Sequence, residues 1–179
     1  MSFWSLFKAA ELKNNRRSAG AETESVRQIV TALNQMDPDR ARFLAAFAYV
    51  LGRVASSDQE FSAEETKTME EIISSRGHLS KEQAGLVVQI ARRQSTHFGG
   101  IEDFVVTREF NRLATYDAKL DLIDCLFAVS AANHSISAVE DNTISQISRE
   151  LKVRHKEFIA IRLRYRDHLD VLKSGYVGI

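Results

Sequence analysis

Hydrophobic residues recur at intervals of three or four positions along most of this chain, the spacing of helices that bury one face. The segments that share this spacing are 22–36, 38–57, 62–76, 80–91, 118–132, 137–151 and 155–173. Residues 101–114 fit either a helix or a short strand at 104–107. Only 8 glycines and 1 proline interrupt the pattern in 179 residues. We therefore predict an all-α fold, a compact domain of about seven to eight helices.

Two of these segments are apolar on nearly every side, which is typical of helices buried in a core. Residues 43–56 include Phe47 and Val50, and residues 118–131 include Leu126. We expect these two stretches to be the most buried parts of the fold.

Polar residues and a glycine mark the expected helix ends. Asp37, which precedes the single proline, and Asp117 can each accept hydrogen bonds from free backbone amides at a helix start. Gly77 stands where helices commonly stop. Ser80 and Gln83 have the spacing of a capping box, in which each side chain bonds the other residue's backbone amide.

The second half of the chain repeats a pattern from the first. Phe47 corresponds to Leu122, Glu65 corresponds to Glu140, and the residues between them match in kind. A buried helix, an elbow and a following helix therefore occur twice. Because a repeat implies related packing environments, we predict two pseudo-symmetric helix-elbow-helix repeats with their central helices side by side.

Each elbow ends in an apolar residue followed by Ser-Ala-x-Glu, and the Ser and Glu of this motif have capping-box spacing. We expect Ser62 with Glu65, and Ser137 with Glu140, to cap the helices that follow. An acidic side chain also suits a helix N-terminus, by about 0.3–1 kcal/mol. Capping alone would explain these four residues.

The first elbow carries acidic residues that a capping box does not need. Asp58 falls where the preceding helix should end, and the carbonyl end of a helix disfavours a carboxylate. Asp58, Glu60 and Glu65 together would offer hard oxygen ligands for a divalent cation, Ca²⁺ or Mg²⁺. A metal site at this elbow is therefore a hypothesis beside the capping role of Glu65.

The second elbow carries less charge at the corresponding positions, Asn133 and Glu140, so we expect it to bind a cation more weakly or not at all. Neither elbow is an EF-hand, because Met69 and Ile144 stand where the bidentate glutamate is required. His134 could add a nitrogen ligand, although a solvated histidine is the simpler interpretation.

The charge balance argues against nucleic acid as a partner. Charged residues make up 27% of the chain and its formal net charge is zero, whereas nucleic-acid-binding domains are usually strongly basic. Arg162, Arg164 and Arg166 form a basic run, but only Arg162 and Arg166 would share a helix face. A solvated helix edge is the favoured interpretation of this run.

A single cysteine, Cys125, excludes an internal disulfide or a zinc site built from several cysteines. Its apolar surroundings predict a buried small hydrophobic residue. No apolar run approaches the roughly 20 residues of a membrane span, and no secretory signal is evident, so we expect a cytoplasmic protein. Signatures of a nucleophile with its base, a phosphate loop or a dinucleotide site are also absent.

The sequence suggests one helical domain with a segment at either end. The parts are an N-terminal amphipathic stub with a linker at 1–21, the domain at 22–173 and a tail at 174–179. The stub could rest on a membrane surface, but packing on the domain or on a partner is favoured. We expect the linker residues 14–21 to be mobile. The aromatic residues of the stub are Phe3, Trp4 and Phe7.

The elbow motif, Ala-x-x-Asp-x-Glu-apolar-Ser-x-x-Glu after a buried helix, resembles that of the TerB-like tellurite-resistance family over roughly residues 25–170. Family elbows usually read Asp-Gly-x-apolar-Ser-x-x-Glu. Here Gln59 and His134 replace the glycines, and Asn133 replaces the second aspartate. The resemblance implies a non-enzymatic helical module, proposed to bind metal ions through acidic elbows and associated with chemical-stress resistance and membrane-linked complexes.

The leading hypothesis is therefore a non-enzymatic interaction or scaffold module that responds to a divalent cation, serves a stress response and acts through protein partners. We expect it in the cytoplasm or at the periphery of the inner membrane. One alternative is a membrane-peripheral adaptor, whose liposome binding would disappear on removal of residues 1–17. Another is an enzyme with a carboxylate-bound metal, whose turnover would depend on Glu65 and Glu140 together.

Overall fold

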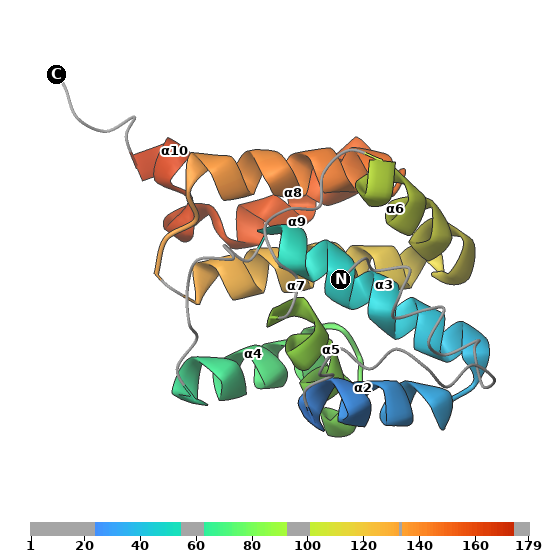
Figure 1. The fold of residues 1–179 in the computed structure, drawn as a ribbon. Coiled ribbons are helices and arrows are strands. Elements are labelled where there is room, and N and C mark those ends of the chain that lie inside the picture. Colours follow the sequence, from blue (N-terminus) through green and yellow to red (C-terminus); the bar gives the residue numbers. More distant parts are fainter. Residues whose placement is uncertain (1–23, 55–62, 93–100, 133, 174–179) are drawn as a thin grey trace, which may run out of the picture.

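The computed structural model describes residues 24–54, 63–92, 101–132 and 134–173, which fold into helices (Figure 1). Within these ranges, 8 helices have seven or more residues and the only β-type pairing is one isolated bridge. The all-α prediction is confirmed. The elements in chain order are α2 (Glu24–Asn34), α3 (Pro38–Val54), α4 (Ala63–Arg76), α5 (Lys81–Arg92), α6 (Ile101–Leu113), α7 (Tyr116–Ala131), α8 (Ala138–Glu150), α9 (His155–Arg164), the 3-10 helix η1 (Arg166–His168) and α10 (Asp170–Lys173).

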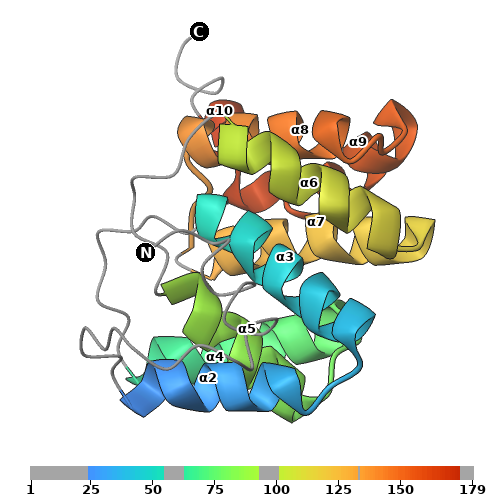
Figure 2. The same cartoon turned by 45° about the vertical axis from the view of Figure 1, so that its right-hand side comes forward.

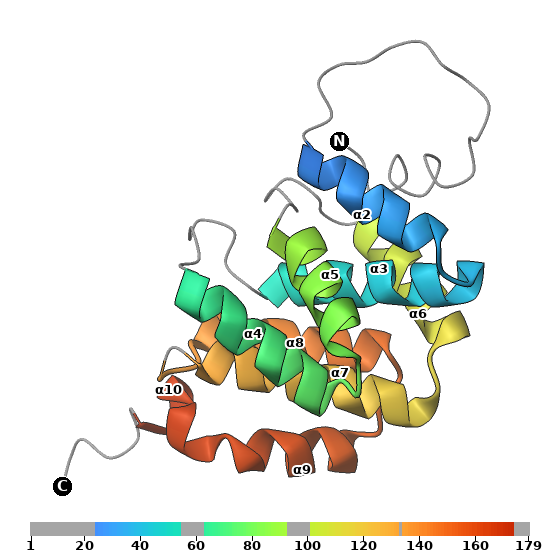
Figure 3. The same ribbon diagram turned by 90° about the horizontal axis from the view of Figure 1, so that it is seen from below.

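Helices α3 and α7 form the centre of the fold. They contact each other; α3 also packs against α5, α6 and α8, and α7 packs against α4, α8 and α9. Figure 2 shows α2, α4 and α5 on one side of this central pair, with α6 and α8 on the other. Figure 3 shows α2 and α9 at opposite edges of the molecule. The two central helices lie side by side as predicted, while the pseudo-symmetry of the two repeats stays a prediction.

The burial of the central helices follows from their sequences. Every residue in 43–51 and in 122–127 is buried. Phe47 packs edge-on against Phe110 of α6, with ring centroids 6.2 Å apart. The centres of the two predicted stretches are thus confirmed as core. Positions 118–121 are only partly buried, and positions 55 and 56 lie outside the described residues.

Residues 101–113 form helix α6, so the strand alternative at 104–107 is wrong. Val106 and Phe110 are 1% and 0% exposed, and Phe104 is 67% exposed. Positions four apart share a face of a helix, whereas in a strand Phe104 and Val106 would lie on the same side. The observed burial therefore matches the helical period.

Of the helix starts assigned outside the elbows, those at Asp37 and Ser80 are confirmed and the one at Asp117 is not. The Oδ1 atom of Asp37 accepts hydrogen bonds from the amides two and three positions later, at 3.0 and 3.1 Å. Ser80 and Gln83 form their reciprocal pair, at 3.3 and 3.4 Å. The expected cap at Asp117 is wrong: Thr115 accepts from the amide of Ala118 at 3.2 Å. The helix therefore begins at Tyr116, one residue before Asp117.

The C-terminal region is not the single helix expected over 155–173. Helix α9 ends at Arg164, and η1 and α10 follow it. The break lets this segment pair with the second elbow: the amide of Ile136 donates to the carbonyl of His168 at 2.7 Å, and the amide of Asp170 donates to the carbonyl of Ile136 at 3.0 Å. A continuous helix would use these backbone groups internally.

The end of α4 differs in detail from the expected glycine stop. His78, with φ of 50°, takes the left-handed conformation in place of Gly77. Gly77 is needed for space, because a Cβ atom there would lie 2.7 Å from the carbonyl oxygen of Ile73 and 3.2 Å from the ring of Phe47. The close approach to the last turn of α4 itself and to Phe47 of α3 thus explains the glycine.

None of the helices in the described ranges is long and apolar enough to cross a membrane.

Candidate functional site

The residues predicted as metal ligands are only partly described. Glu65 lies in the first turn of α4 and is exposed, and Glu140 lies in the first turn of α8. Asp58, Glu60 and Asn133 lie outside the described residues. The same is true of the stub with Phe3, Trp4 and Phe7, of the linker 14–21 and of the tail 174–179.

The second elbow ends in a complete capping box. The Oγ atom of Ser137 accepts a hydrogen bond from the amide of Glu140 at 3.2 Å. The Oε2 atom of Glu140 accepts from the amide of Ser137 at 2.9 Å and from its hydroxyl at 2.7 Å. The capping interpretation is confirmed for these two residues. A cation at this elbow would have to compete with the cap for Oε2 of Glu140.

Asp141, next to the cap, links α8 to α9. Its carboxylate accepts two hydrogen bonds from Arg162, 2.8 Å from Nε and 2.6 Å from the terminal nitrogen. The two side chains are only 11% and 20% exposed. The hydrogen bond to Asp141 raises the pKa of Arg162, while burial opposes that change. A solvated helix edge is therefore the wrong interpretation of Arg162.

The other two arginines of the basic run behave differently from each other. Arg164 lies 3.4 Å from Asp124 of α7. Arg166 pairs with exposed Asp167 in η1, beyond the end of α9. Arg162 and Arg166 thus share no helix face, because the helix that would have aligned them ends between them.

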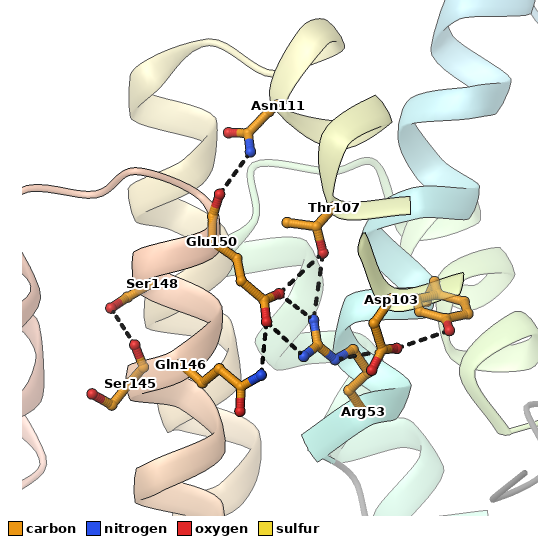
Figure 4. Close-up of polar contacts among 9 residues, drawn as sticks. Arg53, Asp103, Thr107, Asn111, Ser145, Gln146, Ser148 and Glu150 are labelled. Carbon is orange, nitrogen blue, oxygen red and sulfur yellow. Dashed lines mark hydrogen bonds and ion pairs between the residues drawn. The ribbon is translucent and has the colours of Figure 1, made fainter. Parts of the chain in front are cut away.

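A polar network surrounds Arg53 in the last turn of α3, immediately before the first elbow (Figure 4). Its guanidinium donates to the carboxylate of Glu150 of α8 at 2.6 and 3.2 Å. It also lies 3.4 Å from the hydroxyl of Thr107 and 3.5 Å from Asp103, both on α6. The hydroxyl of Tyr49 donates to Asp103 at 2.9 Å. This network joins α3, α6 and α8.

Further bonds fix Glu150 within the network. The side-chain amides of Gln146 and Asn111 donate to its carboxylate and its backbone carbonyl, each at 2.9 Å. Burial alone would raise the pKa of Glu150, but the hydrogen bond and the charge of Arg53 lower it below its ordinary value. Burial would lower the pKa of Arg53, but the hydrogen bond to Glu150 and the nearby carboxylates raise it. Both groups are therefore held in their charged forms.

A second buried carboxylate, Asp124, lies in the middle of α7. It accepts a hydrogen bond from the hydroxyl of Tyr165 at 2.8 Å. Arg76 of α4 lies 3.3 Å from its other oxygen. Burial, followed by the hydrogen bond to Asp124, raises the pKa of Tyr165. The cluster joins α4, α7 and the end of α9.

Cys125 is fully buried, as the sequence predicts. Burial raises the pKa of its thiol, and the neighbouring charge of Asp124 adds to the effect. A cysteine acts as a nucleophile through its thiolate, which a raised pKa disfavours. Cys125 therefore has the properties of a packing residue.

Sequence reasoning missed both networks, although the sequence carries a signal for each. Arg53 stands between apolar residues near the end of α3, and Asp124 interrupts an apolar run in α7. A charge in a buried helix needs a partner. The signal could have indicated buried ion pairs, but it does not identify the partners.

The described residues test the metal hypothesis only in part. Within the described ranges, no group of three or more His, Cys, Asp or Glu side chains could hold a metal ion. Glu140 is engaged by its cap, so the second elbow fits a cation poorly. A site for Ca²⁺ or Mg²⁺ at the first elbow, where Glu65 would be joined by Asp58 and Glu60, stays a prediction, because Asp58 and Glu60 lie outside the described residues.

Comparison with known proteins gives one match. No curated protein and no solved structure matches the chain significantly. The model of the family described as tellurite resistance protein TerB matches residues 43–163, from the middle of α3 to the end of α9. The matched region contains both elbows and the Arg53 network, and it is more than half of the chain. The chain belongs to the TerB tellurite-resistance family.

Proposed function

We propose that this protein is a non-enzymatic scaffold module that acts through protein partners and responds to a divalent cation at its first elbow. The observation that carries the scaffold role is that the buried charged side chains pair with charged side chains on other helices. Arg53 with Glu150, and Asp141 with Arg162, each link two helices. Charged pairs held in this way fix the arrangement of the helices and are not poised to exchange protons with a substrate.

The groups that could have acted as nucleophiles support the same proposal. Burial raises the pKa of the Cys125 thiol and of the Tyr165 hydroxyl, so both favour their neutral forms. Activated nucleophiles in enzymes have a lowered pKa or an adjacent general base. Here the neighbour of Tyr165 is Asp124, which already lies beside Arg76 and Arg164.

The cation is proposed for the first elbow, held by Asp58, Glu60 and Glu65 as hard oxygen ligands. A bound Ca²⁺ or Mg²⁺ would supply positive charge that draws these carboxylates together between α3 and α4. The network around Arg53 supports this role, because it fixes the end of α3 immediately before the elbow. The partners would then bind a scaffold whose elbow is ordered by the ion.

We place this role in chemical-stress resistance, in the cytoplasm or at the periphery of the inner membrane, as the family resemblance implies. A complementation experiment tests it. Cells that lack the gene and grow poorly on tellurite should recover with the wild-type chain, and equally with Cys125→Ala or Tyr165→Phe at matched protein levels. Recovery should fall with Asp58→Asn. Loss of tolerance in a stably expressed Cys125→Ala variant would contradict a non-enzymatic role.

Calorimetric titration tests the cation directly. Ca²⁺ or Mg²⁺ should bind the intact chain, and Asp58→Asn and Glu65→Gln should each weaken that binding at least tenfold, about 1.4 kcal/mol. The matched control is Glu140→Gln at the second elbow, where glutamine can fill the capping box. Equal weakening by Glu65→Gln and Glu140→Gln would contradict a site at the first elbow.

A further inference from the structure

Two arginines at the ends of different helices converge on one buried carboxylate. Helix α4 ends at Arg76 and α9 ends at Arg164; both helices pack on α7, and Figure 1 and Figure 3 show α7 between them. Arg76 donates to the Oδ2 atom of Asp124 at 3.3 Å, and a terminal nitrogen of Arg164 lies 3.4 Å from Oδ1. The side chain of Asp124 is 10% exposed, while those of the two arginines are 51% and 54% exposed. Asp124 therefore holds two half-exposed guanidinium groups close together at the surface.

These contacts differ from the structural ion pairs elsewhere in the protein. Arg162 binds both oxygens of Asp141, at 2.6 and 2.8 Å, and is 20% exposed. Arg53 binds Glu150 through two nitrogens and is 10% exposed. Each arginine at Asp124 uses a single nitrogen over a longer distance, and no other acceptor in the described part of the chain bonds either of them. Because a guanidinium has five N–H donors, both groups keep donors for a further acceptor.

The charges at this point do not balance. Asp124 carries one negative charge against two positive charges, and its Oδ1 atom also accepts from the hydroxyl of Tyr165. Asp121, one turn earlier on α7, lies 3.7 Å from His78, and no ion pair among the described residues joins it to either arginine. One further carboxylate between the guanidinium groups would balance the charge, and the planar guanidinium binds a carboxylate through two parallel hydrogen bonds.

An exposed apolar side chain adjoins the arginine of α9. Leu163 is 52% exposed, and Ala160, one turn earlier, is exposed as well. Together with Arg164 they form the outer face of α9 near its end, because positions three and four apart are neighbours on a helix. Arginine is enriched in protein interfaces. Burial of the leucine would add an apolar contribution that a small free anion could not gain.

We propose that Arg76 and Arg164 form a docking site for an acidic segment of a partner protein, whose carboxylate binds between the two guanidinium groups while an apolar residue covers Leu163. This inference rests on the proposed role of the chain as a scaffold for protein partners, and it states the chemistry of one partner. Asp117 and Asp121 share the adjacent face of α7, where they would repel a polyanionic surface such as nucleic acid or an acidic membrane. One discrete carboxylate is therefore the favoured ligand.

Titration with two short peptides, followed by NMR of the arginine side chains, tests the site in the full chain. The probe is acetyl-Leu-Glu-Glu-Leu-amide, and the control is the same peptide with Gln in place of Glu, both at constant ionic strength. The Nε–H signals of Arg76 and Arg164 should shift to saturation with the acidic peptide only. Arg76→Gln and Arg164→Gln should each weaken its binding about fivefold, the upper range for half-exposed ion pairs. Equal shifts with both peptides, or unchanged affinity in both variants, would overturn the proposal.

Two further variants separate the site from general effects of charge and folding. Arg112 is also 54% exposed but binds Glu109 through two nitrogens, so Arg112→Gln should leave the peptide affinity unchanged. Arg164→Lys keeps a positive charge beside Asp124 and should melt like the wild type, yet it should weaken peptide binding because lysine lacks the planar fork. Equal weakening by Arg112→Gln, or full binding by Arg164→Lys, would contradict a site built from two guanidinium groups.

Other polyanions and the proposed cation are distinguished by two comparisons. Tighter binding to vesicles that contain phosphatidylglycerol, or to duplex DNA, that Arg164→Gln abolishes would overturn the assignment to a protein partner. Asp58→Asn, measured without added divalent ions, should bind the acidic peptide like the wild type. Failure of the peptide to bind while Ca²⁺ or Mg²⁺ still raises the melting temperature would overturn the docking site alone. Peptide binding without any effect of the ions would support the docking site and contradict only the cation response.

Discussion

Arg53 and Glu150, 97 positions apart in the chain, are joined by hydrogen bonds of 2.6 and 3.2 Å. The pair links the last turn of α3 to the last residue of α8. Because the first elbow follows α3 directly, this link fixes the chain immediately before the proposed cation ligands.

Removing Arg53 should show how much its pairing with Glu150 contributes to the stability of the fold. The side chains of Arg53 and Glu150 are 10% and 27% exposed. Arg53→Met leaves the carboxylates of Glu150 and Asp103 without their counter-charge, and we expect a loss of about 2–4 kcal/mol in the free energy of unfolding, measured by urea denaturation. The control is Arg112→Met, which breaks a more exposed pair with Glu109 and should cost much less than Arg53→Met. Similar losses in the two variants would contradict a structural role for the Arg53 network.

The same pair predicts a pH dependence. Arg53 overcomes the effect of burial and lowers the pKa of Glu150 below the ordinary value of 4.5. A carboxyl whose pKa is depressed on folding contributes stability above its unfolded pKa, and this contribution disappears as the pH falls through the folded value. Urea denaturation from about pH 6 down to about pH 3 should therefore show a steeper loss of stability for the wild type than for Glu150→Gln. Parallel curves would mean that Glu150 titrates normally.

The end of α4 offers a paired test of backbone and packing. His78→Gly should stabilise the protein by about 0.5–1 kcal/mol, because glycine accepts the left-handed conformation more readily than histidine. Gly77→Ala should destabilise it by about 1–3 kcal/mol, because the added Cβ would lie too close to the carbonyl of Ile73 and the ring of Phe47. Thermal denaturation of both variants checks the signs. A stabilising Gly77→Ala would show that Ile73 and Phe47 can move away from the added Cβ at little cost.

The helices could be predicted from the sequence because their apolar spacing and caps are local properties. Asp37, Ser80 and the Ser137–Glu140 box each act within one helical turn, and the structure confirms them. Thr115 and Asp117 are both favourable N-cap residues, so the local sequence does not show which of them caps the helix.

The parts that sequence reasoning missed depend on distant contacts. The break after Arg164 follows from backbone bonds between Ile136 and the C-terminal segment. The partners of Arg53 and Asp124 come from helices far away in the chain, so periodicity could indicate a buried charge without identifying what neutralises it. Of the candidate site, the structure confirms the cap at Glu140, while the ligand role of Asp58 and Glu60 stays a prediction.

The most direct test of the account is the melting temperature of the intact chain with and without millimolar Ca²⁺ or Mg²⁺. A cation that binds the folded state stabilises it by linkage, so the wild type should melt at a higher temperature with the ion. Asp58→Asn, which copies the residue at Asn133, should abolish the increase while leaving the metal-free melting temperature nearly unchanged. Glu140→Gln should keep the increase. A wild-type melting temperature that neither ion raises would contradict the cation-responsive scaffold and leave the elbows with a capping role alone.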